Sequence, residues 1–556
     1  MTDPPVPEEL LFVPLGGAGE IGMNLNLYGY GPPGAHRWLM IDCGVTFGGD
    51  GLPGADVMMP DPAFIVEQRD RLDGLLLTHA HEDHLGAVAH LWPRLLCPVY
   101  ATPFALAVLR RKLDEAGLAG RLRPVAIPGE GRLQIGPFAL ELIGMTHSVP
   151  EANAVAIRTP AGTVVHTGDW KLDPVPVIGP SSDEDALRRV GDEGVLALVC
   201  DSTNVFEEGR TGSEGALQES ITDLVAQCER RVVVTCFATN IARLHTIACA
   251  ARDNGRDVVM VGASLKRNYA AARECGYLGD VPPFLEDALG QHLPRHRMLM
   301  VSTGGQGEPR AALARLAHGD HPYLSLEQGD AVIFSSRVIP GNEPQIARVQ
   351  NALLRLGVTL YDHHDGLVHV SGHPARDDLR QMYRLVRPQV AVPVHGELRH
   401  MMEHAALARE MQVADTVVAE NGTVVHLGPG AVCVVDHVPT GRLVLEGKRA
   451  VPADGALVRG RAKAIYNGAV VVTVVLAGLS RTVEDVQISS FGLIEQGEDA
   501  IVEGFCRAAR AAIGELGSEP FRQDESVRDA VRLAIRRLSR QLVDKRPVVE
   551  VHVVRL

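Results

Sequence analysis

One heptapeptide restricts the possible fold and chemistry of this chain more than any other feature: Thr78-His79-Ala80-His81-Glu82-Asp83-His84. It follows the apolar run 75–77 and precedes Gly86, so we predict a tight turn between a buried strand and a helix. In the extended part His79 and His81 share a face, while Asp83 and His84 can point elsewhere. A lone histidine is usually a core or surface residue, but burying this whole cluster without a cation costs too much. We therefore predict a site for two metal ions.

The cluster resembles the ligand turn of the metallo-β-lactamase superfamily. In that superfamily the remaining ligands are a later His, a later Asp at the end of a strand, and a last His. The first two candidates are His147, in Met145-Thr146-His147-Ser148, and Asp169, in Thr167-Gly168-Asp169-Trp170. Asp42 resembles the first aspartate of the superfamily, which orients the ligand turn from behind.

The segments after Asp169 resemble the β-CASP insertion of nucleic-acid-processing enzymes. Its acidic motif is matched at Asp201, its motif-B histidine at His373 and its motif-C histidine at His395. Further matching segments are Cys236-Phe237-Ala238-Thr239-Asn240, Ser302-Thr303-Gly304-Gly305-Gln306-Gly307-Glu308-Pro309 and Ile339-Pro340-Gly341-Asn342-Glu343. Together with the N-terminal segment 14–22, the chain is most similar to the bacterial ribonuclease J family.

This resemblance implies an α/β fold: a metallo-β-lactamase αββα sandwich, an inserted β-CASP α/β domain and a small α/β C-terminal domain. The expected boundaries are 8–205 for the first lactamase part, 206–360 for the insertion, 361–438 for the second lactamase part, 439–455 for a linker and 456–556 for the C-terminal domain. Strand-like patterns are predicted at 367–370, 390–394 and 422–427. Apolar residues at helical spacing from Val527 to Leu542 predict a late helix with an arginine face, followed by a last strand at 549–553.

The resemblance also implies an activity: a metal-dependent ribonuclease with 5′ to 3′ exonuclease and endonuclease modes, acting in mRNA decay and rRNA maturation. By residue-to-residue transfer, His79, His81 and His147 hold one ion, Asp83, His84 and His395 hold the other, and Asp169 bridges them. Asp83, His84, Asp169 and His373 are the implied catalytic residues, with His373 on the leaving-group side, and Asp42 and Asp201 support the ligands. Two Zn²⁺ ions are expected, and Mn²⁺ or Mg²⁺ also suit His and carboxylate ligands.

Single-stranded RNA with a 5′ monophosphate is the implied substrate. Segment 369–373 is expected to form a pocket for that phosphate from hydroxyl, backbone and imidazole donors. The alternative is that Ser371 and Gly372 only form the turn that aims His373. The candidate RNA- and phosphate-binding residues are His369, Val370, Ser371, Gly372, His373, Ser264, Arg267 and Asn240.

The net charge of −14 offers no global attraction for RNA, so binding must be local. The basic residues that could line a channel are Lys266, Arg267, Arg243, Arg310, Arg337 and Arg376. Aromatic residues make up only 4% of the chain, which favours recognition of the RNA backbone over base stacking.

The N-terminal glycines match the spacing of a dinucleotide-binding fingerprint, but the fold unit that this fingerprint requires is not predicted. Gly17, Gly19 and Gly22 follow an apolar strand, and Asp42 lies about twenty residues on. However, residues 24–30 alternate like a strand, so the helix that this fold unit requires is missing. Tight turns explain these glycines instead.

Composition fits a multidomain enzyme of the cytoplasm. The 556 residues suggest about three to four domains. No apolar run approaches the roughly twenty residues of a membrane span, and the N-terminus is acidic and proline-rich, unlike a signal peptide. The nine cysteines show no CxxC spacing. The arginine face of the late helix could touch RNA, but a solvated face or a subunit contact is favoured. The resemblance implies a small C-terminal domain tied to oligomerisation, so a subunit contact and a homodimer or homotetramer are expected, with partners in an RNA-degradation complex as a further option. The alternatives are a DNA-processing β-CASP nuclease, a small-molecule metallo-hydrolase and a non-catalytic RNA scaffold.

Overall fold

The computed structural model describes residues 8–48, 52, 54–129, 131–339, 341–477, 482–495 and 497–556. The proline-rich N-terminus and Pro340 of the insertion motif lie outside this part. Two compact units divide the chain. One contains residues 1–46 and 59–441, and the other contains 47–58 and 442–556.

The first unit contains an eight-stranded sheet in which antiparallel strands meet parallel ones. Its order is β25 (Cys433–His437), β24 (Thr423–Gly428), β1 (Glu9–Gly16), β3 (Leu25–Gly31), β4 (Arg37–Ile41), β7 (Leu72–Leu76), β8 (Val99–Ala101) and β9 (Val125–Ala126). From β4 to β9 the strands are parallel, so each connection must cross over the sheet. These connections contain α1 (Ala63–Val66), η1 (Arg69–Arg71), α2 (Glu82–Leu85), α3 (Val88–Leu95) and α4 (Pro103–Glu115).

A seven-stranded sheet packs against the first. Its order is β10 (Arg132–Ile135), β11 (Phe138–Met145), β12 (Ala152–Thr159), β13 (Gly162–His166), β14 (Ala197–Asp201), β21 (Val390–Val394) and β23 (Asp415–Thr416). Phe12 and Tyr28 of one sheet share a buried core with Phe138, Val199 and Val392 of the other. The second sheet buries its other face against α5 (Glu184–Glu193), α12 (Arg376–Val386) and α13 (Leu398–Glu410). This arrangement confirms the predicted αββα sandwich.

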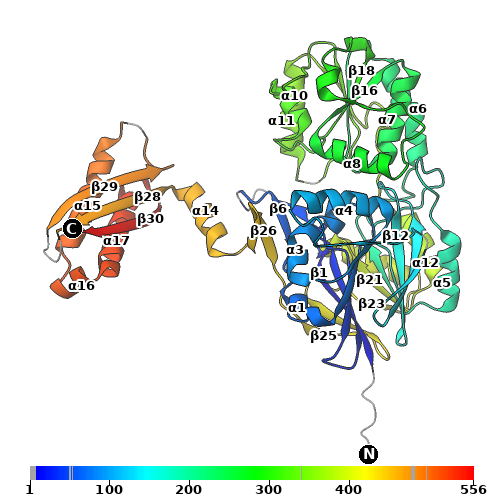
Figure 1. Cartoon of the computed structure of the whole chain (residues 1–556), viewed down its shortest axis with the longest axis horizontal. Helices are drawn as coiled ribbons and strands as arrows, with labels where there is room; N and C mark the ends of the chain where they lie inside the picture. The colour runs from blue at the N-terminus through cyan, green and yellow to red at the C-terminus, as the bar shows by residue number, and fades with distance from the viewer. Residues whose placement is uncertain are drawn as a thin grey trace, which may run out of the picture. The chain divides into compact units, whose positions relative to one another are not determined.

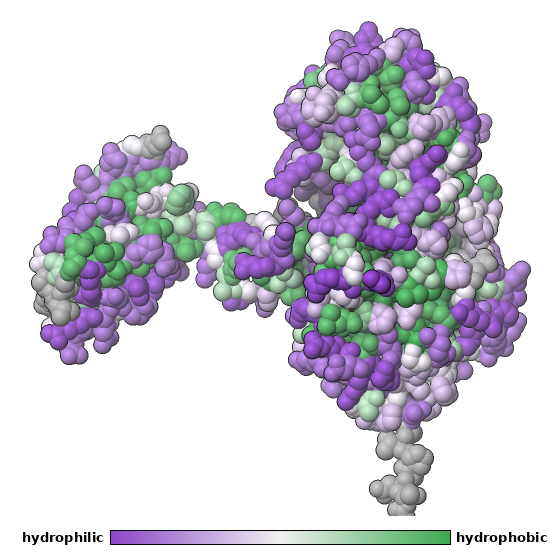
Figure 2. All heavy atoms as spheres, in the orientation of Figure 1, coloured by the Kyte–Doolittle hydropathy of each residue, from purple (hydrophilic) through white to green (hydrophobic). Residues whose placement is uncertain are grey.

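A separate α/β domain is inserted between β14 and β21. Its six strands are all parallel, in the order β17 (Leu285–Glu286), β16 (Asp257–Val261), β18 (Met298–Ser302), β15 (Val232–Thr235), β19 (Ala331–Phe334) and β20 (Thr359–Tyr361). Helices α10 (Ala312–His318) and α11 (Glu343–Arg355) pack on one side, and α6 (Leu217–Ala226) and α7 (Ile241–Asp253) lie on the other (Figure 1). Shorter connections contain η2 (Glu214–Ala216), α8 (Ala263–Glu274), α9 (Asp287–Gly290) and η3 (Arg295–Arg297). On the visible face, hydrophilic residues surround a strip of hydrophobic ones (Figure 2).

Segment 367–370 is not the strand that its alternating pattern predicted. In this segment, side chains rather than a neighbouring strand form hydrogen bonds with the backbone. The carbonyl oxygen of Val368 accepts hydrogen bonds from Ser335 Oγ at 2.6 Å and Arg243 Nη1 at 3.2 Å. The segment therefore runs outside both sheets, toward His373.

The second unit contains two small sheets. The segment expected as a linker forms a hairpin, β26 (Arg442–Glu446) and β27 (Arg449–Pro452), which continues a sheet with β6 (Val57–Pro60) and β5 (Thr46–Phe47). After α14 (Ala456–Asn467) comes a sheet in the order β29 (Val483–Phe491), β28 (Ala469–Leu476) and β30 (Val548–Arg555). It shares a core with α15 (Asp499–Gly514) and α17 (Asp524–Val543), and α16 (Ser518–Arg522) joins the two helices.

The late helix was predicted correctly in position. Val527, Val531 and Ile535 are buried, but Leu542 is 51% exposed. On the arginine face, Arg528 and Arg532 form ion pairs with acids three residues earlier in the same helix. Across the described residues, every helix is too short or too polar to span a membrane.

Candidate metal centre

The candidate ligands all stand where strands of the two sheets end. His79 and His81 lie between β7 and α2, and Asp83 and His84 form the first turn of α2. His147 lies between β11 and β12, Asp169 follows β13, and His395 follows β21 directly. Because the ends of β7, β13 and β21 meet at one edge of the sandwich, residues far apart in sequence come together there.

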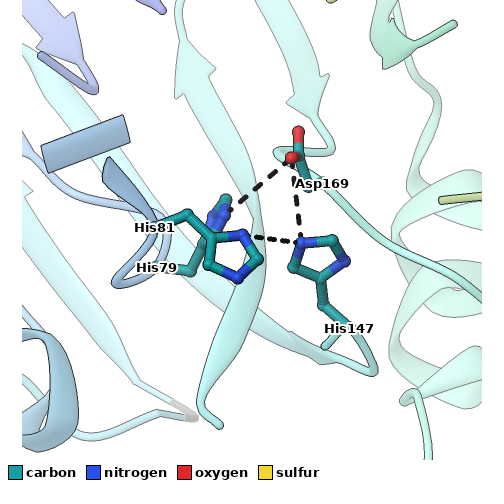
Figure 3. A group of neighbouring side chains, drawn as sticks. All are labelled: His79, His81, His147 and Asp169. Atoms are coloured by element: carbon teal, nitrogen blue, oxygen red, sulfur yellow. Dashed lines mark hydrogen bonds and ion pairs between the residues drawn. The ribbon is translucent and has the colours of Figure 1, made fainter. Parts of the chain in front are cut away.

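The first cluster contains His79, His81, His147 and Asp169 (Figure 3). His147 Nε2 lies 3.0 Å from His81 Nδ1. Asp169 Oδ2 lies 3.9 Å from His79 Nε2 and 3.8 Å from His147 Nε2. The other nitrogen of His147, Nδ1, donates to the carbonyl oxygen of Gly372 at 2.6 Å, which aims Nε2 into the cluster.

A second cluster contains Asp83, His84, Asp169 and His395. Asp169 Oδ2 lies 3.2 Å from His84 Nε2, and Asp83 Oδ2 lies 3.2 Å from His395 Nε2. Asp169 is therefore the one carboxylate common to both clusters. It also belongs to a third group, with Asp201, His373 and His395.

The pKa values of the histidines are shifted in opposite directions in the two clusters. Burial and neighbouring imidazoles lower the pKa of His79 and His147 well below the ordinary value, and burial lowers that of His81 to about 4. Burial acts in the same direction on His84 and His395, but there the nearby carboxylates prevail and raise the pKa. The first cluster thus presents neutral imidazoles, and in the second cluster two carboxylates lie close to the imidazoles.

Asp42 and Asp201 each accept a hydrogen bond from a histidine of the site. Asp42 Oδ2 accepts from His84 Nδ1 at 2.7 Å, and its two oxygens also accept from the backbone and hydroxyl of Thr78. Asp201 Oδ2 accepts from His373 Nδ1 at 2.8 Å, and its Oδ1 lies 3.4 Å from His395 Nδ1. The bond to Asp42 occupies Nδ1 of His84 and leaves its Nε2 directed at the second cluster.

Buried atoms in the centre lack the partners that protein interiors normally supply. His79 Nε2 and Asp169 Oδ1 are fully buried, and neither has a hydrogen-bond partner. Such atoms are costly unless something else satisfies them. A set of imidazole nitrogens and carboxylate oxygens without sulfur suits a divalent cation such as Zn²⁺ or Mn²⁺, so the residues fit the predicted metal pair.

The predicted phosphate-binding segment lies beside the clusters. His369 Nδ1 is buried without a hydrogen-bond partner. Its pKa is lowered to about 3 by burial and by the neighbouring cations Arg243, Arg337 and Lys171. Ser371 Oγ accepts from Asn204 Nδ2 at 2.7 Å and from the backbone nitrogen of His373 at 3.2 Å.

Other predicted RNA-contact residues have structural partners instead. Arg243 is fully buried and paired with Glu214 at 3.0 Å, and the side chain of Asn240 caps α7 by accepting from the backbone nitrogen of Arg243. Arg376 is buried and bonds Glu403 at 2.5 Å. These contacts give Asn240 and Arg243 roles inside the protein, while Arg376 pairs with an acid but keeps a buried Nε without a hydrogen-bond partner.

The remaining basic candidates lie on or near the surface of the insertion. Arg267 is exposed and lies 3.6 Å from Glu115 of α4, while Lys266 bonds Asp287 at 3.0 Å. Ser264 is half-buried in the first turn of α8. Arg337 pairs with Glu207 at 2.5 Å and is about half exposed.

Sequence reasoning missed three residues of the site. Asn24 contacts His84 of the second cluster, Asn204 bonds Ser371 of the phosphate-binding segment, and the charge of Lys171 contributes to the lowered pKa of His369. The signal for Asn24 was its place after the glycines, which were treated only as turns. Lys171 stands two residues after Asp169, so its position could have indicated a contribution to the site.

Comparison with known proteins agrees with this geometry. Residues 33–199 match the metallo-beta-lactamase superfamily, and 229–353 match the ribonuclease J beta-CASP domain. Residues 366–419 match a Zn-dependent metallo-hydrolase RNA specificity domain, and 456–556 match the ribonuclease J C-terminal domain.

Similarity to whole proteins extends over nearly the full chain. Ribonuclease J of Sinorhizobium meliloti is 43% identical over 99% of this chain and 98% of its own length. The chain belongs to the ribonuclease J family. Ribonuclease J of Mycolicibacterium smegmatis is 37% identical over 95% of both chains, and that of Thermus thermophilus is 35% identical over 97% of this chain and 94% of its own.

A crystal structure of an Enterococcus faecalis protein of unknown function shares the fold, with a TM-score of 0.52 at 16% identity over 75% of this chain and all of that one. As a member of the ribonuclease J family, this protein is a metal-dependent ribonuclease that binds RNA and a divalent metal.

Proposed function

We propose that this ribonuclease J homologue cuts single-stranded RNA both from the 5′ end and internally, with two zinc ions per chain. The observation that carries the proposal is Asp169, whose carboxylate belongs to both clusters of buried ligands. One shared carboxylate between two sets of imidazoles is the arrangement that a pair of ions requires.

One ion would be held by His79, His81 and His147. The other would be held by Asp83, His84 and His395, and Asp169 would contribute to both sites. Such a pair activates water and neutralises charge on the phosphate when bound. Zinc is proposed because nitrogen donors predominate, while Mn²⁺ is the alternative that metal analysis distinguishes.

Hydrolysis adds water to phosphorus and breaks the bond to the 3′ oxygen, which must receive a proton as it departs. We assign this role to His373. Its Nδ1 donates to Asp201, which fixes the ring and leaves Nε2 to face the substrate. The 3′ product of each cut carries a new 5′ phosphate.

We propose that the segment from His369 to His373 binds this 5′ phosphate. Ser371 Oγ already accepts two hydrogen bonds, so its own hydrogen is left to donate. His369 Nδ1 is buried without a hydrogen-bond partner, so in the tautomer that protonates this nitrogen it is a second donor. These donors suit a compact dianion, and a pocket fitted to it would reject the bulkier triphosphate.

The biological setting follows the family. We propose roles in mRNA decay and rRNA maturation in the cytoplasm, a homodimer or homotetramer, and association with other RNA-degrading proteins. Preference for RNA over DNA would rest on contacts to the 2′ hydroxyl.

The test compares one RNA sequence with a 5′ monophosphate, a 5′ triphosphate and a matched DNA, each with and without a chelator. We expect metal-dependent release of mononucleotides from the 5′ end, fastest for the monophosphate, together with slower internal cuts. Equal rates on monophosphate and triphosphate ends would refute the pocket. Equal rates on DNA would indicate a DNA-processing β-CASP nuclease, and release from the 3′ end would reverse the assigned direction.

A further inference from the structure

The glycine-rich segment 16–24 has no part in the chemistry described so far. It joins β1 to β3 and contains the short strand β2 (Ala18–Gly19). Three of its glycines, Gly17, Gly19 and Gly22, have positive φ values, which explains their presence. The segment lies against the second cluster, and its contacts there are specific.

One contact holds His395. The backbone nitrogen of His395 donates to the carbonyl oxygen of Gly17 at 2.6 Å. Directly after it, β22 (Gly396–Glu397) pairs in parallel with β2. His395 itself has a φ of 51°, a left-handed conformation that a non-glycine residue keeps only when its surroundings impose it. The glycine segment supplies part of that constraint.

A second contact holds two further ligands of the cluster, Asp83 and His84, through Asn24, which is 3% exposed. Its backbone nitrogen donates to the carbonyl oxygen of Asp83 at 2.8 Å, and its Nδ2 donates to the same oxygen at 3.1 Å. Nδ2 also lies 3.1 Å from His84 Nε2, the nitrogen that Asp42 leaves available for a metal.

The side chain of Asn24 also explains why position 17 is a glycine. A Cβ atom on Gly17 would lie 2.1 Å from Asn24 Oδ1 and 2.9 Å from its Cγ, so a larger residue at position 17 would displace the amide. Gly17 thus serves both contacts, since its carbonyl oxygen holds His395 and its missing side chain makes room for Asn24.

Among the candidate ligands, the hydrogen bonds of Gly17 and the close contacts of Asn24 reach Asp83, His84 and His395, which all belong to the second cluster. We propose that Asn24 is a positioning residue for the second half of the metal pair. It sets the affinity of the Asp83, His84 and His395 half-site for its ion without changing the other half-site. This inference rests on the proposed two-ion centre.

Asn24→Ala tests it by isothermal titration of Zn²⁺ into chelator-stripped protein, with metal content measured after dialysis. Loss of a residue that supports metal ligands costs roughly 10–100-fold in metal affinity. We expect one ion to bind the variant as in wild type and the other to bind at least about 10-fold more weakly. Asn26→Ala is the matched control, because it removes a second buried asparagine, which lies in β3 and whose Oδ1 has no hydrogen-bond partner among the described residues.

Wild type is titrated first. If it binds fewer than two ions, both the centre and this inference fail. If wild type binds two ions and Asn24→Ala weakens both equally, or neither, the positioning role alone is refuted. The thermal midpoint of the metal-free variant reports folding. If Asn24→Ala does not fold, Asn24→Ser, which keeps a donor in part of the same space, provides the same comparison.

Discussion

Gly372→Ala should disable the first half-site through one added methyl group. The backbone at Gly372 is not in a left-handed conformation, so alanine is tolerated locally. However, its Cβ would lie 2.7 Å from His147 Cε1, 2.8 Å from His147 Nδ1 and 3.1 Å from Ser148 Oγ. These distances are shorter than van der Waals contact, so the ring of His147 must move.

The size of the effect follows from the bond that this movement breaks. His147 Nδ1 donates to the carbonyl oxygen of Gly372 at 2.6 Å, and this is the bond that aims Nε2 at the first cluster. Losing such support costs roughly 10–100-fold in metal affinity. At about 1.4 kcal/mol for each factor of ten, this is about 1.4–2.8 kcal/mol of binding free energy.

Titration of Zn²⁺ into metal-free Gly372→Ala, with RNA cleavage followed in parallel, measures this loss. We expect the ion of the His79, His81 and His147 half-site to weaken and cleavage to recover partly as Zn²⁺ is raised. Gly129→Ala is the control, since a Cβ there would meet open space. Wild-type affinity for both ions in Gly372→Ala would show that the carbonyl contact does not support His147.

Three further results are expected. Asp169→Ala or His81→Ala should abolish cleavage while RNA binding measured by gel shift is largely kept; activity with wild-type rates would contradict the shared-carboxylate centre. Ser371→Val should slow decay of 5′-monophosphorylated RNA while internal cleavage survives, and equal slowing of both in a time course would assign Ser371 to the turn alone. Glu214→Ala leaves the guanidinium of Arg243 buried and unpaired, so urea unfolding should show a free energy of unfolding lowered by about 3–5 kcal/mol. A decrease below about 1 kcal/mol would mean that water reaches Arg243.

The sequence predicted those parts of the site that lie close together along the chain. The turn from His79 to His84 was recognised because an apolar strand precedes it and the ligand types are dense. Asp169 and His395 were found only through the family resemblance, since no local pattern brings together residues that far apart. The sandwich was predicted on the same basis.

Errors arose where side chains replaced the expected partners. Segment 367–370 alternates like a strand, yet Arg243 and Ser335 bond its backbone. Asn240 and Arg243 looked available for RNA, but Arg243 is buried against Glu214 and Asn240 is buried as the N-cap of α7. The hairpin at 442–452 was taken for a linker because its strands are short and its partner, β6, lies far away in sequence.

The pairing of β2 with β22 also bears on how a nascent chain acquires its activity. When the ribosome has finished Asp169, the inserted domain and His395 are still to be made, and β1 still lacks its partner β24. At roughly 5–20 residues per second, synthesis of the intervening segment takes on the order of ten to forty-five seconds. During that interval the growing polypeptide has one half-site and no closed active site. The site can therefore close only after the ribosome has passed residue 395 of the 556 that the message encodes.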